Sequence, residues 1–159
     1  MSVFNNIFTG NVFLPKLEII AEDENLMPFY AHPGDAGMDL RSSEDVTVRL
    51  GQIKPIDTGI KVAIPDGYVG LVNPRSSLGG QGITVANSPG TVDSGYRGPL
   101  KVLLVNHSEY GADFEVKRGD RIAQLLIVPV ATARIQRVTE FSDADTSRGE
   151  GGFGSTGTN

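Results

Sequence analysis

Short runs rich in β-branched residues recur along this chain, and each run ends at residues that favour turns. Runs separated in this way are typical of β-strands. Apolar residues nowhere hold a 3.6-residue period for three turns, so the pattern predicts no long amphipathic helix. Strands are expected over residues 16–21, 45–50, 53–57, 60–64, 68–73, 100–106, 114–116 and 122–130.

Turn-forming residues separate the expected strands. Segments 65–67, 88–90 and 117–120 contain residues that either fix φ or tolerate unusual values of it. The best short helical candidate is the turn over residues 75–79. Glycine supplies 20 of the 159 residues, well above the roughly 7% of average usage, which indicates many turns. The pattern therefore predicts an all-β fold, a jelly roll or distorted β-barrel of short strands.

Two of the expected strands contain nearly continuous apolar runs, over residues 100–105 and 122–128. A strand with one wet face alternates apolar and polar residues, so both runs are too hydrophobic for such a position. Either they lie at the centre of a sandwich, or they contact another subunit.

Charge and composition narrow the function classes. The formal net charge is -5 and the pI is near 5.0, whereas duplex nucleic acid is bound by clustered positive charge. The chain has no cysteine, which excludes disulfides, thiolate nucleophiles and zinc–thiolate sites. No run approaches the roughly 20 apolar residues of a membrane helix, and residues 1–8 do not resemble a secretory signal. We expect one domain in the cytoplasm, or in the host cytoplasm if the protein is viral, without nucleic-acid or membrane partners.

Segment 90–98 places a carboxylate and a phenol three residues apart between two glycines. Gly90 and Gly98 permit positive φ, and Asp93 could act as a general base with Tyr96 as the wall for a sugar. Asn87, a few residues upstream, can both donate and accept hydrogen bonds to a base edge. The alternative is an Asx-turn with a packed tyrosine.

Two earlier segments carry groups suited to a metal and to phosphate. In segment 35–40, Asp39 could hold water bound to a hard cation such as Mg²⁺, or it could cap a turn through backbone N–H groups. In segment 74–80, Arg75, Ser76 and Ser77 offer a guanidinium group and two hydroxyls at the start of a helical turn, which suits phosphate. The alternative there is a plain loop with a surface arginine.

Two later segments complete the set. Residues 118–124 are mostly a turn that leads into a buried strand, so their charges are expected to be structural, with Gln124 as the exception. The tail carries groups that suit a lid, although a solvated terminus is the usual alternative: Arg148, Phe153, Ser155 and Thr156. The two histidines, His32 and His107, lie far apart in sequence and give little support for a histidine metal site or a catalytic triad.

Taken together and in this order, the five segments resemble the motifs of the homotrimeric dUTP pyrophosphatases (dUTPases) over residues 16–157. The resemblance implies a jelly-roll homotrimer that hydrolyses dUTP to dUMP and pyrophosphate with Mg²⁺, with each active site between subunits. Such an enzyme controls the dUTP level and supplies dUMP for thymidylate synthesis. The chain would then divide into an N-terminal extension of unknown role (1–14), a β-barrel domain (15–142) and a flexible C-terminal arm that closes over an active site (143–159).

The same resemblance implies a role for each candidate residue. Asp93 would activate the water that attacks the α-phosphorus, Asp39 would orient waters bound to Mg²⁺, and Tyr96 would pack on the deoxyribose. Uracil would be bound by Asn87 and neighbouring backbone groups, including those of Thr91 and Val92. The triphosphate would be held by Arg75, Ser76, Ser77 and Gln124. Substrate contacts from the arm would come from Arg148, Phe153, Gly154, Ser155 and Thr156.

Two other functions stay open on the residues alone. A dCTP deaminase of the same broad fold needs a glutamate to shuttle protons at the cytosine ring, where this chain presents Asp93. A nucleotide-responsive binding protein would sense dUTP while residues 1–14 or a surface loop engage a partner. Two positions depart from the family pattern, because Ser77 is usually glycine and Pro99 stands where a polar or acidic residue is more familiar.

Overall fold

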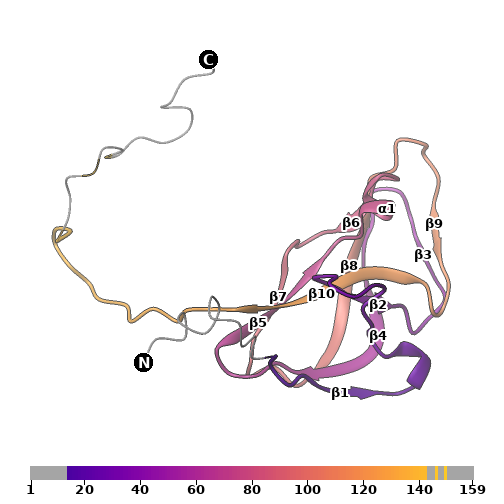
Figure 1. The fold of residues 1–159 in the computed structure, drawn as a ribbon. Helices are drawn as coiled ribbons and strands as arrows, with labels where there is room; N and C mark the ends of the chain where they lie inside the picture. The colour runs from indigo at the N-terminus through magenta and orange to yellow at the C-terminus, as the bar shows by residue number, and fades with distance from the viewer. Residues whose placement is uncertain (1–13, 143–145, 147–148, 150–159) are drawn as a thin grey trace.

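The structure of this chain is a computed structural model that describes residues 14–142, Thr146 and Gly149. Most of the predicted N-terminal extension and most of the predicted arm therefore lie outside the described residues. The described part consists of antiparallel strands around one core, followed by an extended segment (Figure 1).

The described chain contains ten strands, one short α-helix and one 3-10 helix. In chain order these elements are β1 (Glu18–Ala21), η2 (Glu24–Leu26), β2 (Met38–Arg41), β3 (Val46–Val48), β4 (Ile53–Ala63), β5 (Tyr68–Asn73), α1 (Ser76–Gly79), β6 (Ile83–Val85), β7 (Gly90–Val92), β8 (Pro99–Asn106), β9 (Phe114–Val116) and β10 (Arg121–Pro129).

Most of these strands form two four-stranded sheets. The first sheet has the order β1-β4-β8-β6 and the second has the order β2-β10-β5-β7, while β3 and β9 pair separately. Every pairing is antiparallel. Two antiparallel sheets whose neighbouring strands are distant in sequence are the arrangement of a jelly roll. The predicted all-β fold class is therefore confirmed.

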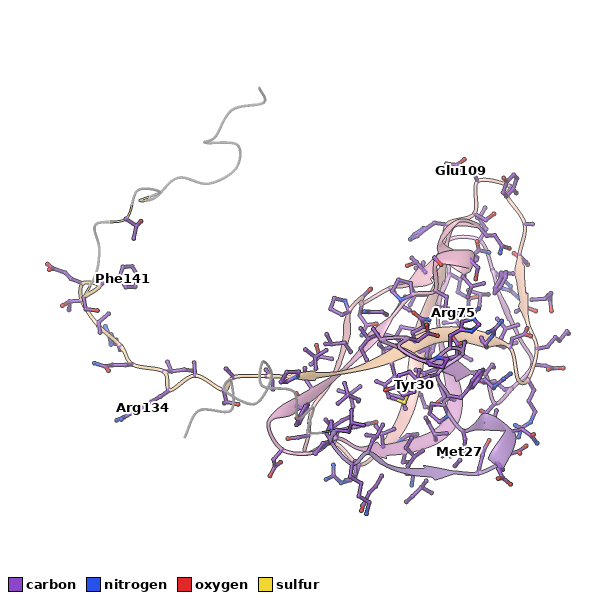
Figure 2. All side chains as sticks on the ribbon, viewed as in Figure 1. Met27, Tyr30, Arg75, Glu109, Arg134 and Phe141 are labelled. Atoms are coloured by element: carbon purple, nitrogen blue, oxygen red, sulfur yellow. The ribbon has the colours of Figure 1, made fainter. Side chains whose placement is uncertain are left out.

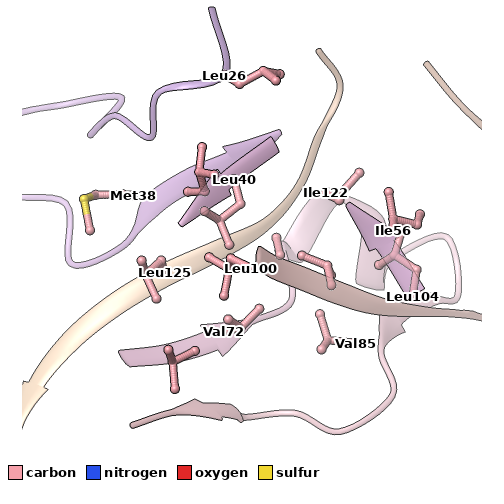
Figure 3. Close-up of a cluster of buried hydrophobic side chains, with 14 of the residues drawn as sticks. Leu26, Met38, Leu40, Ile56, Val72, Val85, Leu100, Leu104, Ile122 and Leu125 are labelled. Atoms are coloured by element: carbon pink, nitrogen blue, oxygen red, sulfur yellow. The ribbon is translucent and has the colours of Figure 1, made fainter. Parts of the chain in front are cut away.

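The hydrophobic core takes alternate residues from both sheets (Figure 3). Leu100 and Leu104 of β8 and Leu125 of β10 are buried in it. Burying a side chain of this size contributes roughly 1.5–3 kcal/mol relative to leaving it exposed. The two continuous apolar runs thus supply the centre of the sandwich, while Leu103, which alternates with the core residues of β8, is only half-buried.

The sequence pattern does not predict three of the strands, β2, β6 and β7. Strand β2 is four residues long and contains Asp39 and Arg41, so its apolar pattern is too short to detect. Strand β7 begins at Gly90, where the sequence indicates a turn, but residues 90–92 pair with β5. Short strands that carry polar or glycine residues escape a periodicity argument because too few positions alternate.

The expected strands at 53–57 and 60–64 are one strand, β4. Its pairing with β8 is irregular between Asp57 and Lys61. Gly59 lies inside this irregularity with a φ of +68°, and a Cβ there would lie 2.6 Å from Leu26 Cδ1. Glycine is therefore required at this position, and the resulting bulge lets the strand continue across the sheet.

A surface ion-pair group joins η2 to the turn between β9 and β10. Arg118 Nη2 lies 2.8 Å from Asp23 Oδ2, and Arg118 Nη1 lies 3.6 Å from Glu22 Oε1. A hydrogen bond from the backbone N–H of Asn25, and then the Arg118 guanidinium, hold the pKa of Asp23 below its ordinary value. Arg118 is therefore structural, as the sequence predicts.

Beyond β10 the chain leaves the sheets. Residues 130–142 belong to no strand, and every one of them is exposed. Figure 1 shows this segment running away from the strands. The boundary at residue 142 stays a prediction. No helix in the described part is long and apolar enough to span a membrane.

Candidate active site

A pocket of about 400 Å³ lies where β7 ends and β8 begins. Strand β7 belongs to the second sheet and β8 to the first, so residues 93–98 cross between the sheets and leave a hollow at their edge. The pocket brings together four of the sequence-predicted site residues. Its lining consists of Thr91, Val92, Asp93, Tyr96, Pro99, Leu100 and Lys101.

The side chain of Asp93 is exposed in this pocket. The turn that follows it is closed by backbone groups, because Tyr96 N–H donates to the Asp93 carbonyl at 3.1 Å. The Asp93 carboxylate accepts no hydrogen bond and forms no ion pair within residues 14–142. An Asx-turn would use that carboxylate to hold the backbone, so this alternative does not describe the site, and both oxygens are available to a ligand or water.

Tyr96 lies across the same connection. Its hydroxyl donates to the carbonyl of Pro99 at 2.9 Å, and 44% of the residue remains exposed. A Cβ at position 98 would overlap the Tyr96 hydroxyl. Gly98 is therefore needed so that the phenol can turn back onto the start of β8, where it forms a partly exposed aromatic wall.

Gly90 has a similar role at the other end of the segment. A Cβ at this position would lie 3.3 Å from Asn87 Nδ2 and 3.3 Å from Val72 Cβ. Gly90 thus admits the amide of Asn87 close to the first residue of β7. Neither Gly90 nor Gly98 has a positive φ. The sequence-based expectation that these two glycines serve to permit positive φ is therefore wrong. The structure gives close approach as the reason instead of a left-handed backbone: a Cβ at Gly98 would overlap Tyr96, and a Cβ at Gly90 would be tightly packed.

A second cluster surrounds Asp39, which is only 2% exposed. Arg75 Nε donates to Asp39 Oδ1 at 3.0 Å, and Arg121 Nη1 donates to Asp39 Oδ2 at 3.1 Å. Arg75 Nη1 also donates to the carbonyl of Arg121 at 3.3 Å. A buried carboxylate is stable only when it is paired, and two guanidinium groups engage both of its oxygens here.

The second sheet explains why these residues meet. Asp39 on β2 pairs with Gln124 on β10, and Gln124 pairs with Asn73 on β5. Directly paired residues share a face of a sheet, and Arg75 follows Asn73 by two residues. The structure therefore brings Asp39, Arg75 and Gln124 together although they lie far apart in sequence. Figure 2 shows Arg75 in the body of the molecule.

The predicted helical turn at 75–79 is confirmed as α1, which begins at Ser76. Leu78 and Gly79 N–H groups both donate to the carbonyl of Arg75. The N–H groups of Ser76 and Ser77 have no backbone acceptor in the described chain, as expected for the first turn of a helix. Both hydroxyl side chains are exposed beside Arg75.

Arg121 is a residue that the sequence argument misses. The sequence predicts a structural role for the charges of residues 118–121, and Arg118 has such a role. Arg121 instead contacts the carboxylate of Asp39 inside the second cluster. Its only sequence signal is that it precedes Gln124 by three residues, which places the two side chains on opposite faces of a regular strand.

The two clusters lie at opposite ends of β5. Val92 pairs with Gly70 of β5, which places the next residue, Asp93, opposite Val69 near the start of β5. Arg75 lies two residues beyond the last residue of β5. At about 3.4 Å per residue, the Cα atoms of Asp93 and Arg75 are separated by roughly 20 Å. Within one chain the candidate base and the candidate phosphate ligands are therefore far apart.

No group of three or more histidine, cysteine, aspartate or glutamate side chains arranged to hold a metal ion occurs in the described residues. His32 and His107 are both exposed and belong to neither cluster. The remaining predicted site residues lie outside the described part of the chain: Arg148, Phe153, Gly154, Ser155 and Thr156.

Comparison with known proteins identifies the family of this chain. A family model described as dUTPase matches residues 23–157. The deoxyuridine 5'-triphosphate nucleotidohydrolase of Clostridium kluyveri is 52% identical over 136 residues, which cover 85% of this chain and 92% of that protein. The enzyme of the same name from Cutibacterium acnes is 51% identical over 132 residues, with coverage of 82% and 85%.

Solved structures give the same result. The dUTPase of Staphylococcus bacteriophage 80alpha with dUPNHPP has a TM-score of 0.82 and 31% identity, and the match covers 91% of this chain and 99% of that one. A mutant dUTPase from phage phi11 of S. aureus, described with the coordination of a structural Mg(II) ion, has a TM-score of 0.72 and 29% identity, with coverage of 80% and 99%.

Proposed function

Because this chain belongs to the dUTPase family, it is a dUTP diphosphatase, and we propose that Asp93 activates the water that cleaves dUTP into dUMP and pyrophosphate. The observation that carries this proposal is the free carboxylate of Asp93 in the pocket between β7 and β8. A carboxylate without a partner in the described chain can accept a proton from water.

In the proposed reaction Asp93 takes one proton from a water molecule while the water oxygen attacks the α-phosphorus. The bond between this phosphorus and the oxygen that bridges to the β-phosphorus breaks, and pyrophosphate leaves. Tyr96 packs against the deoxyribose. Asn87 and the backbone of Thr91 and Val92 bind uracil, which the close approach of the Asn87 amide to Gly90 supports.

The second cluster is proposed to hold the triphosphate. Arg75, Ser76, Ser77 and Gln124 offer a guanidinium group, two hydroxyls and an amide next to the first turn of α1. Phosphoryl transfer depends mainly on positioning and on neutralising charge, and charge-assisted hydrogen bonds from arginine supply both.

The separation of the two clusters supports a homotrimer with each active site between subunits. The Cα atoms of Asp93 and Arg75 are roughly 20 Å apart along β5, and the pocket that contains Asp93 is lined by no residue of the Asp39 cluster. We therefore infer that Asp93 and Tyr96 of one copy act together with Asp39 and Arg75 of another copy.

Magnesium is part of this proposal, and the phage phi11 relative, described with a structural Mg(II) ion, supports the binding of this metal within the family. Both oxygens of Asp39 already accept from arginines, so this residue suits hydrogen bonding to metal-bound water better than direct coordination. Mg²⁺ commonly keeps several waters and binds substrate phosphates, which fits these residues. When bound, the ion would neutralise charge on the phosphates.

The arm belongs to the same proposal. Arg148, Phe153, Gly154, Ser155 and Thr156 would close over the nucleotide of a neighbouring copy and exclude water from the phosphates. Deleting residues 148–159 should leave the thermal midpoint unchanged and remove most dUTP turnover. Full turnover by the shortened protein would exclude this role.

We also propose a cytoplasmic location, where a deoxynucleotide substrate would be encountered.

One experiment tests the proposed function as a whole. The protein is incubated with dUTP, dCTP, dTTP and UTP, with and without Mg²⁺, and pyrophosphate and ammonia are measured. Pyrophosphate from dUTP alone, dependent on Mg²⁺, is the expected result. Ammonia from dCTP would indicate a deaminase, and dUTP binding without pyrophosphate would indicate a nucleotide-sensing protein.

A further inference from the structure

A β-bulge in β10 turns Arg121 toward the second cluster. Along β10, Ala123 pairs with Leu40 and Gln124 pairs with Asp39, but the next pair toward the start of the strand joins Arg121 to Arg41. Between the Ala123 and Arg121 pairs, the chain advances by two residues on β10 and by one residue on β2. The extra residue is Ile122, which is 1% exposed and lies in the core with Ala123.

The bulge decides the face on which Arg121 lies. In a regular strand, residues 121, 123 and 125 would share one face, and Ala123 and Leu125 are core residues. Because Ile122 and Ala123 both turn inward, Arg121 instead lies on the face of Gln124 and Asp39. Bulges beside functional sites commonly redirect a side chain in this way.

The contacts of Arg121 also exceed what charge balance requires. Arg75 alone would neutralise the Asp39 carboxylate, and Arg121 adds a second guanidinium group at 3.1 Å. The cluster therefore carries one excess positive charge. Arg41, which pairs with Arg121 across the two strands, has partners other than Asp39. Its guanidinium carbon lies 4.9 Å from the centroid of the Phe29 ring, and its Nη1 donates to the Gly119 carbonyl at 2.7 Å.

We propose that Arg121 is a positioning residue that keeps Arg75 available for the substrate phosphates, an inference that rests on the proposed function. Arg121 holds Asp39 Oδ2, so Arg75 donates only Nε to this carboxylate. Without Arg121, both carboxylate oxygens are free to take Arg75 in a bidentate pair. A bidentate pair between Arg75 and Asp39 would occupy N–H donors of the Arg75 guanidinium that are proposed to bind the triphosphate.

The test compares Arg121→Gln, Arg121→Lys and the control Arg118→Gln, which removes the same charge from a surface ion pair. Binding of dUMP and of the imido analogue dUpNHpp is measured for each, with pyrophosphate release from dUTP. Arg121→Gln should weaken dUpNHpp binding about 10- to 100-fold, leave dUMP binding within about twofold, and raise KM more than it changes kcat. Arg121→Lys should recover most of the loss, and Arg118→Gln should change neither affinity.

A double-mutant cycle with Asp39→Asn separates positioning from direct phosphate contact. Once the carboxylate is gone, removing Arg121 should have little further effect on dUpNHpp affinity. Additive losses would overturn the proposal in favour of direct contact. Equal loss of dUMP and dUpNHpp binding in Arg121→Gln would also overturn it, as would unchanged binding of both. Absence of dUTP hydrolysis by the unmodified protein would contradict the proposed function instead, and the binding comparison would still decide the role of Arg121.

Discussion

Asp93 and Asp39 carry the same functional group in opposite surroundings. Asp93 lies exposed in the pocket between β7 and β8, and its carboxylate has no partner in the described chain. Asp39 is 2% exposed, and arginines occupy both of its oxygens. A free carboxylate can take a proton from water, whereas a carboxylate that already accepts from two arginines is suited to holding those side chains and metal-bound water in place.

The difference shows how one side chain serves two purposes in one fold. The turn at Asp93 is closed by backbone groups, so the side chain is left free for chemistry. The strand at Asp39 lies beside β10, which supplies Arg121, and Arg75 reaches the same carboxylate from beyond the end of β5. Substitution of Asp93 should therefore mainly lower activity, and substitution of Asp39 should mainly lower stability.

The largest effect is expected at Asp93. Asp93→Asn should lower kcat for dUTP by roughly 10²–10⁴-fold, since the group that accepts the water proton is lost. KM and the thermal midpoint should stay close to those of the unmodified protein, because the carboxylate supports no contact within residues 14–142. Steady-state pyrophosphate release and thermal unfolding measure the two quantities.

Asp66→Asn is a suitable control for this change. Asp66 is also exposed and also lies in a turn, so its substitution removes the same charge without touching the pocket. Turnover by Asp66→Asn should equal that of the unmodified protein. Turnover retained by Asp93→Asn would show that another group activates the water.

Asp39→Asn should lower activity less than Asp93→Asn does, and should lower stability more. Asp39→Asn leaves two arginines without a counter-charge, one of them with only 18% of its side chain exposed. The free energy of unfolding should fall by about 3 kcal/mol, the lower end of the range for a broken buried pair because the Arg121 side chain is 43% exposed, which lowers the thermal midpoint by roughly 6–12 °C. Calorimetry checks this value, and an unchanged midpoint would contradict a structural clamp.

The smallest effect is expected at Asp23, an exposed carboxylate paired with Arg118. Solvent screens such pairs, so Asp23→Asn should lower the thermal midpoint at pH 7 by about 1–3 °C. Since the pKa of Asp23 is lowered in the folded protein, its stabilising effect is present above the unfolded pKa and disappears as the pH falls. Midpoints of both proteins should therefore converge below about pH 4, and a constant difference would contradict this origin.

Much of the fold follows from local sequence, as β5 and β9 illustrate. Both have the predicted bounds, 68–73 and 114–116, because β-branched residues are followed there by clear turn residues. Strand β2 is different, since half of its residues are charged. It is a strand because β10 pairs with it, and pairing between distant segments leaves no periodic signal in so short a run.

The candidate site shows a similar division. Asp93, Tyr96 and Arg75 stand out because their residue types and neighbouring glycines or serines suggest chemistry. Arg121 does not, because only the bulge at Ile122 places it beside Asp39. A bulge depends on how two strands pair, and a single sequence does not specify that pairing. The same is true of Gly98, whose role depends on the path of the Tyr96 side chain.

We infer that the Asp93 pocket and the Asp39 cluster act together only across two copies of the chain. Mixing two inactive variants, Asp93→Asn and Arg75→Ala, tests this claim directly. The two are produced together with different affinity tags, and assemblies that carry both tags are isolated. Each variant alone should be nearly inactive.

In a mixed assembly, some sites combine an intact Asp93 from one copy with an intact Arg75 from its neighbour. In a homotrimer that contains both variants, about one third of the sites are intact in this way, because one of the three directed pairs of neighbouring copies combines the two intact residues. The doubly tagged assemblies should therefore recover up to about a third of the normal rate of pyrophosphate release. A mixture that stays as inactive as either variant alone would show that both clusters must come from one chain, and would contradict the account.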